Sequence, residues 1–434
     1  MEIPETHANA APLYGPRYSE NPIAAYRALR LEYGDVAPIL LEGDVPAWLV
    51  LAFREAQFVL GNPDLFPSDG RHWNLWDQIP QDWPLRIIAA WSPALRFTEG
   101  AELERRTGAI SDVLTAVDAT ELARTCERAA EHLIDVFHPA GTADLTVQYA
   151  LPLAVGVLAY HYGLRGDGLS ALVDDILNAS EQRSEAAFRS AAIRVAGLVG
   201  QIRDAQGSGS HVPGRQRPGR QPPGKPGTGT QGGGLAARLA AHPAGLTNEE
   251  LVIDLTLMLA MASRAVSDWI ANTLRRMLGD DRFTLIVDGG TVGVSQALTE
   301  VLWTDSPTQN LMGRWAAWDC DLAGRRIRKG DLLVIGLQAA NADPLVRPAS
   351  FSDVSVSRAH LAFGHGDHAC PFGAPEIAEI IARTAVETLL DRLPDVALTL
   401  PAGILSWRDM VWTRSLRSLP VAFEPAPGAD SGTR

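Results

Sequence analysis

The chain has 434 residues, of which 46% are hydrophobic and 21% charged, so it can form a large buried core. Its net charge of −13 argues against a nucleic-acid-binding protein, because a phosphate backbone demands clustered Lys and Arg. Three scattered cysteines, Cys126, Cys320 and Cys370, cannot form a disulfide framework and indicate a reducing compartment. No basic-then-apolar leader and no long N-terminal apolar run is present, so we expect a cytoplasmic protein without a membrane span.

The first 97 residues combine strand and loop signals. The run Trp48–Phe53 is the clearest predicted strand, because it is apolar and rich in β-formers. Residues 71–97 are rich in Trp and Pro. This composition is compatible with a surface loop that its rings pin to the core, and equally with a lid over a substrate.

A polar insertion interrupts the middle of the chain. Residues 102–200 have mostly helical patterns, whereas Gly, Pro, Ser, Gln and Arg dominate residues 207–234. Such a segment buries too little apolar surface to offset the entropy of ordering, so we expect a disordered insertion there. Its arginines suit nucleic acid, but the segment is short and the rest of the chain is acidic, which favours a solvated insertion.

A long apolar helix is predicted after this insertion. Thr247 and Glu250 have the spacing of a capping box, and the apolar pattern then runs to about Leu278. Charged residues within it argue against a membrane span, so we expect a central helix that crosses the core. A helix over 294–303 and strands within 314–335 are predicted next.

The most informative motif is a loop near the C-terminus that ends in a cysteine. It reads Phe363-Gly364-His365-Gly366-Asp367-His368-Ala369-Cys370, and an amphipathic helix with one charged stripe follows it. A thiolate on such a loop can bind a metal from one side. Gly366 lacks the Cβ that would collide with a flat cofactor, and His368 can hydrogen-bond an anionic group at the cofactor's edge. An isolated cysteine in this context is otherwise a small buried apolar residue.

The order F-G-x-G-x-H-x-C resembles the haem-binding loop of the cytochrome P450 family. The turn Ala340-Asn341-Ala342-Asp343-Pro344 also resembles a turn of that family, and the resemblance covers most of the chain outside 207–234. It implies a mainly α fold with small β-sheets, one cytochrome P450 domain over 1–434, and haem b as cofactor. Cys370 would then be the metal ligand, whose thiolate donates electron density to the iron.

The resemblance also implies roles for other residues. Phe363 would pack on the proximal side of the haem, and His368 and Arg314 would bind its propionates. A histidine that the family often has on the helix after Phe97 is missing, so Arg105 or Arg106 would serve there. The Trp-rich segment would roof the haem pocket, which favours the lid.

The chain departs from the family pattern after Glu300. The family normally has E-x-x-R, whereas the stretch Glu300-Val301-Leu302-Trp303 ends in tryptophan, as in an actinobacterial branch that it resembles. We expect Trp303 to pack in the core and Glu300 to bind another arginine or a backbone N–H, because an unpaired buried carboxylate is costly. Pro371 removes one backbone donor from the neighbourhood of the sulfur, which should lower the reduction potential of the iron.

The central helix lacks the acid–alcohol pair with which the family relays protons to dioxygen, and Arg264 replaces one of its members. Arg264 either extends to the rim of the pocket or presents a cation to a substrate carboxylate. We therefore expect a haem-thiolate monooxygenase that oxidises a small organic substrate with dioxygen and electrons from a ferredoxin and ferredoxin reductase. The alternatives are a peroxide-dependent haem enzyme in which Arg264 anchors a carboxylate, and a catalytically degenerate haem-binding partner or sensor.

Overall fold

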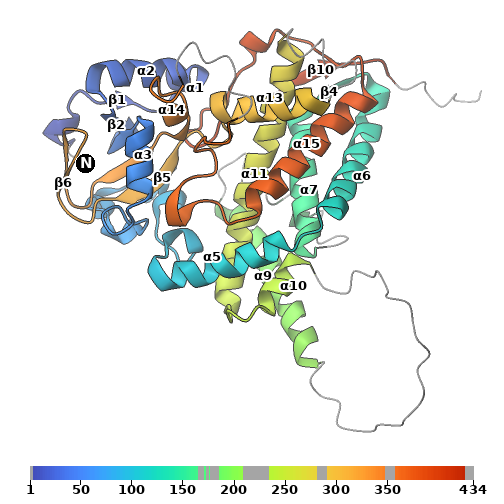
Figure 1. Cartoon of the computed structure of the whole chain (residues 1–434), viewed down its shortest axis with the longest axis horizontal. Coiled ribbons are helices and arrows are strands. Elements are labelled where there is room, and N and C mark those ends of the chain that lie inside the picture. The colour runs from blue at the N-terminus through green and yellow to red at the C-terminus, as the bar shows by residue number, and fades with distance from the viewer. Residues whose placement is uncertain are drawn as a thin grey trace, which may run out of the picture.

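The computed structural model describes residues 3–164, 171–172, 175, 185–208, 234–280, 291–347 and 357–425. Long helices gather on one side of the molecule, and a five-stranded sheet with short helices lies on the other (Figure 1). This is the mainly α architecture with small sheets that the sequence predicts. The long helices are α5 (Gly100–Thr115), α6 (Ala119–Phe137), α7 (Leu151–Tyr162), α9 (Glu185–Ser208), α11 (Asn248–Gly279), α13 (Thr291–Thr304) and α15 (Ala374–Arg392). The other helices are α1 (Pro16–Glu20), α2 (Pro22–Tyr33), α3 (Phe53–Leu60), α4 (Arg86–Ala89), α10 (Leu235–Ala240) and α14 (Leu337–Asn341).

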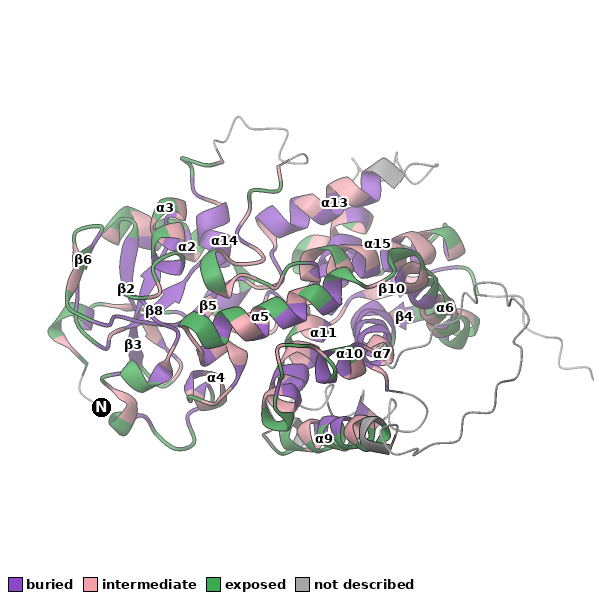
Figure 2. Cartoon of the chain, turned by 60° about the horizontal axis from the view of Figure 1, so that its bottom comes forward, coloured by how far each residue is buried: buried purple, intermediate pink, exposed green. Residues whose placement is uncertain are grey.

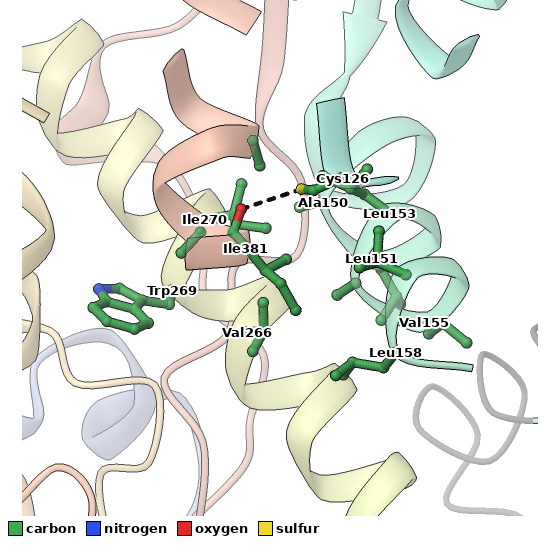
Figure 3. Packing of buried hydrophobic residues seen from close by; sticks show 14 of the residues in the cluster. Cys126, Ala150, Leu151, Leu153, Val155, Leu158, Val266, Trp269, Ile270 and Ile381 are labelled. Carbon is green, nitrogen blue, oxygen red and sulfur yellow. Dashed lines mark hydrogen bonds between the residues drawn. The ribbon is translucent and has the colours of Figure 1, made fainter. Parts of the chain in front are cut away.

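Helix α11 begins at the predicted capping box. The backbone N–H of Glu250 donates to Thr247 Oγ1 (3.1 Å), and the N–H of Thr247 donates to Glu250 Oε2 (2.8 Å). The helix lies between two apolar cores, since Ile270 packs among the long helices and Ile253 packs on the sheet side. Within the helical core, Val266 and Ile270 lie close to Ile381 of α15 (Figure 3). The predicted central helix is therefore confirmed.

The large sheet has the strand order β1-β2-β3-β8-β5. Strands β2 and β3 are antiparallel, β3 and β8 are parallel, and β5 and β8 are antiparallel with a register shift at Gly313. A three-stranded sheet has the order β4-β10-β9, and β6 pairs with β7. The strands are β1 (Ala11–Pro12), β2 (Val36–Leu41), β3 (Val45–Val50), β4 (Thr142–Asp144), β5 (Leu311–Trp315), β6 (Cys320–Leu322), β7 (Arg325–Ile327), β8 (Leu332–Ile335), β9 (Ala397–Leu398) and β10 (Pro420–Ala422).

The strand predicted over 48–53 begins earlier and ends earlier than expected. Strand β3 ends at Val50, and helix α3 begins at Phe53. The amides of Leu51 and Ala52 instead donate to the carbonyl of Asp35, which closes the turn into α3. Apolar composition alone cannot distinguish a strand from the turn that follows it.

Helix α15 has the buried face that its pattern predicts. Ile381, Val386 and Leu389 are fully buried, and α15 packs against α6. The thiol of Cys126 on α6 donates to the carbonyl of Ile381 (3.5 Å), as Figure 3 shows. Burial raises the pKa of that thiol to about 12, so Cys126 is an inert core residue.

Two further expectations concern the middle of the chain. The insertion predicted over 207–234 lies outside the described residues, except for its first two residues at the end of α9 and Gly234. Over the described residues, no helix combines the length and apolar composition needed to cross a membrane.

The Trp-rich segment is attached to the sheet core. The ring of Trp73 lies 5.6 Å from Trp83 and 6.4 Å from Trp315 of β5, which belongs to a sheet whose strands are mostly buried (Figure 2). Trp91 remains exposed. Trp83 donates its indole N–H to the carbonyl of Glu42 (2.6 Å). These contacts explain how the rings hold an otherwise loop-rich segment in place.

Candidate functional site

The cysteine loop leaves the sheet side of the molecule and leads directly into α15. The amide of Cys370 donates to the carbonyl of Phe363 (2.9 Å), and the amide of Gly364 donates to the carbonyl of Leu361 (2.9 Å). The loop also contains a short 3₁₀ turn, Gly366–His368. Backbone hydrogen bonds thus fix the position of the cysteine at the start of a long, buried helix.

The contacts and backbone angles of the loop explain why it contains glycine at positions 364 and 366. Gly366 has a φ of 70°, and a Cβ there would lie 2.4 Å from the carbonyl oxygen of Leu60 at the end of α3. Gly364 has a φ of 80°, and its Cβ would lie 3.3 Å from the Cα of Ala369. A side chain at either position would be strained. We expected Gly366 to allow close approach to a cofactor, but the contact with α3 already accounts for it.

Cys370 combines an exposed surface with a desolvating environment. It is the exposed one among the three free cysteines, yet burial by the surrounding protein raises the pKa of its thiol to about 11. A side chain that faces an internal space has this combination. A cation such as a metal ion would therefore favour the thiolate at this position.

Phe363 connects the loop to the central helix. Its ring lies 5.9 Å from the ring of Trp269 on α11 and 5.9 Å from that of His360. Trp269 is held in turn, because it donates its indole N–H to the carbonyl of Leu298 (3.0 Å). The cysteine loop and α11 are thus packed together by aromatic contacts.

His368 binds polar groups from the segment before α5. Its Nε2 atom lies 3.0 Å from Ser68 Oγ and 3.1 Å from Glu99 Oε2. Burial raises the pKa of Glu99, but the hydrogen bonds from His368 and Ser68 outweigh it, so the net shift is downward. His368 therefore lies beside an ionised carboxylate of the protein.

Two buried arginines lie close together near this carboxylate. The Nε and Nη2 atoms of Arg314 on β5 are buried without a hydrogen-bond partner among the described residues. Arg96 lies near it, since a Cβ on Gly313 would be 3.5 Å from Arg96 Nη2. The pKa of each guanidinium is lowered to about 10, mainly by burial, and for Arg96 repulsion from Arg314 is the second cause.

Unpartnered nitrogen atoms on a buried guanidinium group, as on Arg314, are costly and indicate a missing anion. The carboxylates of a haem group fit this requirement, because charge-assisted bonds to carboxylate satisfy guanidinium donors. Arg314 was expected in this place from the sequence. Arg96 was missed, because nothing in the segment around it distinguishes it from other surface arginines.

Arg105 and Arg106 have different partners from those expected. Arg105 pairs with Glu250 on α11. Arg106 is fully buried and forms a bidentate ion pair with Asp254, with Nη2–Oδ2 at 2.6 Å and Nε–Oδ2 at 3.0 Å. Both guanidinium groups are thus bound to carboxylates of the central helix, and they join α5 to α11.

Arg264 is also in an ion pair. Its Nε atom donates to Asp268 Oδ2 (3.0 Å) and to Ser415 Oγ (3.2 Å). Its side chain is largely buried, so the first interpretation, a cation that extends to the rim, does not describe it. Its charge is balanced within the protein, which weakens the second interpretation, an anchor for a substrate carboxylate.

The unusual Trp303 is a buried packing residue, as expected. It donates its indole N–H to the carbonyl of Ser357 (2.8 Å), and its ring lies 5.8 Å from that of His360. Glu300 pairs with Arg276 of α11. Glu300 therefore binds another arginine, as expected. The spacing of residues in the sequence could not show which helix provides that arginine.

The chain resembles characterised bacterial proteins along its whole length. It is 26% identical over 440 residues to the vitamin D(3) 25-hydroxylase of Pseudonocardia autotrophica, which covers 98% of this chain and 99% of that protein. It is 27% identical over 426 residues to cytochrome P450 105C1 of a Streptomyces species, with 95% and 99% covered. No family model matches the chain.

Solved structures have the same fold. CYP154C4 from Streptomyces sp. ATCC 11861 matches with a TM-score of 0.77 at 22% identity, over 96% of this chain and 99% of that one. P450BioI, solved with an acyl carrier protein, matches with a TM-score of 0.74 at 22% identity, over 94% and 99%. Together with the cysteine loop and the buried arginines, these similarities identify the chain as a member of the cytochrome P450 family, whose members bind haem iron and act as monooxygenases.

Proposed function

We propose that Cys370 binds the haem iron and that the protein inserts one atom of dioxygen into an uncharged, largely apolar organic molecule. The observation that carries this proposal is the desolvated but accessible thiol of Cys370, at the entrance to α15. When bound, haem supplies the oxidation chemistry through its thiolate-ligated iron. The protein residues hold it and shape the space for the substrate.

Arg96, Arg314 and His368 are the residues proposed to hold the propionates. The unpartnered nitrogen atoms of Arg314 support this role most directly. Glu99 lies beside His368, and its carboxylate places a negative charge near the guanidinium of Arg314. Phe363 packs against α11 and keeps the cysteine loop in place.

The central helix supports an apolar substrate. Met261 is 52% exposed in the middle of a helix that is otherwise mostly covered, and we propose that its side chain borders the substrate. Leu257 lies one turn before it and Ala265 one turn after it, on the same face. The nearest cation, Arg264, is neutralised by Asp268. The helix face formed by Leu257, Met261 and Ala265 offers dispersion contacts to a substrate and no unbalanced charge that would bind a carboxylate.

The peroxide-dependent alternative depended on a free cation at Arg264, and the ion pair removes that support. The relative named as a vitamin D(3) hydroxylase suggests an apolar substrate for this chain too. Electrons would come from a ferredoxin and its reductase in a reducing cytoplasm, which the three unpaired cysteines favour. A degenerate sensor would bind haem without turnover.

The experiment is a carbon-monoxide difference spectrum of the reduced protein, with Cys370→Ala as the variant and Cys320→Ala as a matched control. The parent and the control should show the red-shifted band of a thiolate ligand, and Cys370→Ala should not. A red-shifted band in Cys370→Ala would refute the assignment. Turnover of apolar compounds with ferredoxin, reductase and dioxygen then separates the enzyme from a haem-binding sensor.

A further inference from the structure

Four tryptophan rings from the Trp-rich segment and from β5 form one connected group in the sheet core. The ring of Trp73 lies 6.4 Å from that of Trp315 and 5.9 Å from that of Trp76. The ring of Trp83 lies 5.6 Å from Trp73 on another side. Phe or aliphatic side chains would hold the segment on the sheet as well, because packing requires only apolar volume. Tryptophan differs from these side chains in chemistry, since its indole ring gives up an electron far more easily.

The exposure of these rings changes in one direction along the group. Trp315 is fully buried, Trp73 is almost fully buried, and Trp76 is half-buried. We call these three residues the tryptophan series. The series leads from the interior of the protein to its surface, with Trp73 in the middle. Trp83 also packs on Trp73 but is buried itself, so it is a side branch that ends in the core.

The inner end of the tryptophan series lies at the arginines proposed to hold the haem propionates. Trp315 directly follows Arg314 on β5. A Cβ on Gly313 would lie 3.4 Å from the ring of Trp315 and 3.5 Å from Arg96 Nη2, so the ring and that guanidinium approach the same point of the strand. A haem bound by these arginines would therefore present its propionate edge to Trp315.

The inner two rings cannot release a proton. The indole N–H groups of Trp315 and Trp73 are buried and have no hydrogen-bond partner among the described residues. Buried indole N–H groups usually have a partner, so these two require an explanation. An indole ring that has lost an electron becomes strongly acidic at its N–H. Without an acceptor the proton stays in place, so each ring can regain an electron from its neighbour and return to its original state.

The outer end of the tryptophan series has different surroundings. The guanidinium of Arg86 lies 4.2 Å from the centroid of the Trp76 ring. A cation in this position is attracted to the neutral ring and disfavours a positively charged one. Water has access to Trp76, because this residue is only half-buried. Loss of an electron from Trp76 is therefore coupled to loss of its indole proton to water, which leaves a neutral radical at the surface.

We propose that the tryptophan series carries oxidising equivalents away from the haem when no substrate takes them. The proposal rests on the proposed haem site. Trp315 gives one electron to the haem, Trp73 restores Trp315, and Trp76 restores Trp73 and releases its indole proton to water. A small hydrogen donor in solution, such as ascorbate, then returns one hydrogen atom to Trp76. Two such passages reduce one hydrogen peroxide, so that one peroxide and two donor molecules give two waters and two donor radicals.

The alternative is that these rings are packing residues alone. Oxidation of tryptophan by peroxide would then follow exposure to solvent. Trp91 is 41% exposed and makes no ring contact with the tryptophan series among the described residues. It would be oxidised at least as much as Trp76. The proposal requires the reverse order, because Trp76 is oxidised from the interior of the protein.

The experiment treats the haem-loaded protein with a small excess of hydrogen peroxide in the absence of substrate. Mass spectrometry of its peptides then measures oxidised tryptophan at each position. Trp76 should be oxidised several times more than Trp91 in the parent, and protein from which the haem has been removed should lose this preference. Equal oxidation of Trp76 and Trp91 in the haem-loaded parent would overturn the proposal, and this comparison needs no variant.

Two variants test the order of the rings. In Trp73→Phe, oxidation at Trp76 should fall about 10-fold, because a Phe ring is much harder to oxidise and raises the barrier to transfer. Haem absorbance should also bleach faster in this variant, since the oxidising equivalents remain at the haem. Trp83→Phe is the matched control, because Trp83 is as buried as Trp73 but lies outside the series. It should keep the parental pattern, and an unchanged Trp76 signal in Trp73→Phe or an equal fall in both variants would overturn the proposal.

The carbon-monoxide band and a turnover assay separate this proposal from the proposed reaction. A protein with the thiolate band but without preferential oxidation of Trp76 refutes the tryptophan series alone. Preferential oxidation of Trp76 in a protein that does not oxidise apolar compounds supports the tryptophan series and refutes the proposed reaction alone. A protein that binds no haem contradicts both.

Discussion

Trp303 donates its indole N–H to the carbonyl oxygen of Ser357 across 2.8 Å, and this bond joins α13 to the segment that leads into the cysteine loop. In the usual family pattern an arginine holds this region by an ion pair. Here a neutral hydrogen bond and an aromatic contact with His360 hold it instead. Glu300, freed from that role, binds Arg276.

Replacing Trp303 should therefore cost stability in a graded way. Trp303→Phe keeps most of the packing and loses one hydrogen bond, which costs about 1 kcal/mol of unfolding free energy. Trp303→Arg should cost more, because Glu300 already has its arginine and the new cation would be buried beside His360. Urea denaturation of both variants tests this order. A Trp303→Arg variant more stable than the parent would show that the packing account is wrong.

Arg314 and Arg96 should govern how tightly haem is retained. Each hydrogen bond to a charged group contributes about 1.5–3 kcal/mol, so Arg314→Ala should release haem roughly 10- to 100-fold faster. Arg96→Ala should act in the same direction. The rate of haem transfer to an excess of a haem-accepting protein measures this loss, while the wavelength of the carbon-monoxide band should stay unchanged.

Arg105→Ala is the matched control for haem retention, since its guanidinium binds Glu250 on α11. It should release haem at the parental rate. If Arg105→Ala accelerated release as much as Arg314→Ala, the assignment of the propionate site to Arg314 would fail.

The buried pair of Arg106 and Asp254 should be important for folding. Arg106→Leu leaves a buried carboxylate without its cation, at a cost of about 3–5 kcal/mol. Arg106→Leu combined with Asp254→Leu removes both charges and should regain part of that loss. Arg105→Leu breaks a more exposed pair and should cost under about 1 kcal/mol. Denaturant midpoints of unfolding distinguish these outcomes. An Arg106→Leu variant with the same stability as the parent would contradict the prediction.

His360 should make the protein less stable in acid. Burial lowers the pKa of its ring to about 4, from an ordinary value of 6.5, because its surroundings disfavour the cation. Between these two values the unfolded chain binds the proton and the folded chain does not, so stability is present above about pH 6.5 and is lost as pH falls toward 4. The loss has an upper limit of about 3 kcal/mol.

His360→Phe isolates this contribution, because the buried His7, whose pKa is also lowered, remains in the variant. Unfolding free energies of the parent and the variant at a series of pH values between 7 and 4 provide the measurement. The parent should lose more stability than the variant over this range. Parallel curves for the two proteins would mean that His360 carries its proton in the folded state as readily as in the unfolded one.

The sequence by itself determined the local features of this protein. The capping box at Thr247 fixed the start of α11, because its two hydrogen bonds lie within four residues. The order of Phe363, the glycines, His368 and Cys370 identified the family, because the loop carries its chemistry in one short segment. The helix after the loop followed from its apolar period.

Only the tertiary structure decided which distant residues pair. Arg276 binds Glu300 from another helix. Arg106, which the family resemblance suggested as a haem-binding residue, instead pairs with Asp254. Arg96 enters the propionate site because a loop folds it beside Arg314, and no local pattern marks that approach. An ion pair between distant segments forms only where tertiary packing brings the two side chains together. Charged side chains show little periodicity in the sequence, so their spacing does not reveal these partners.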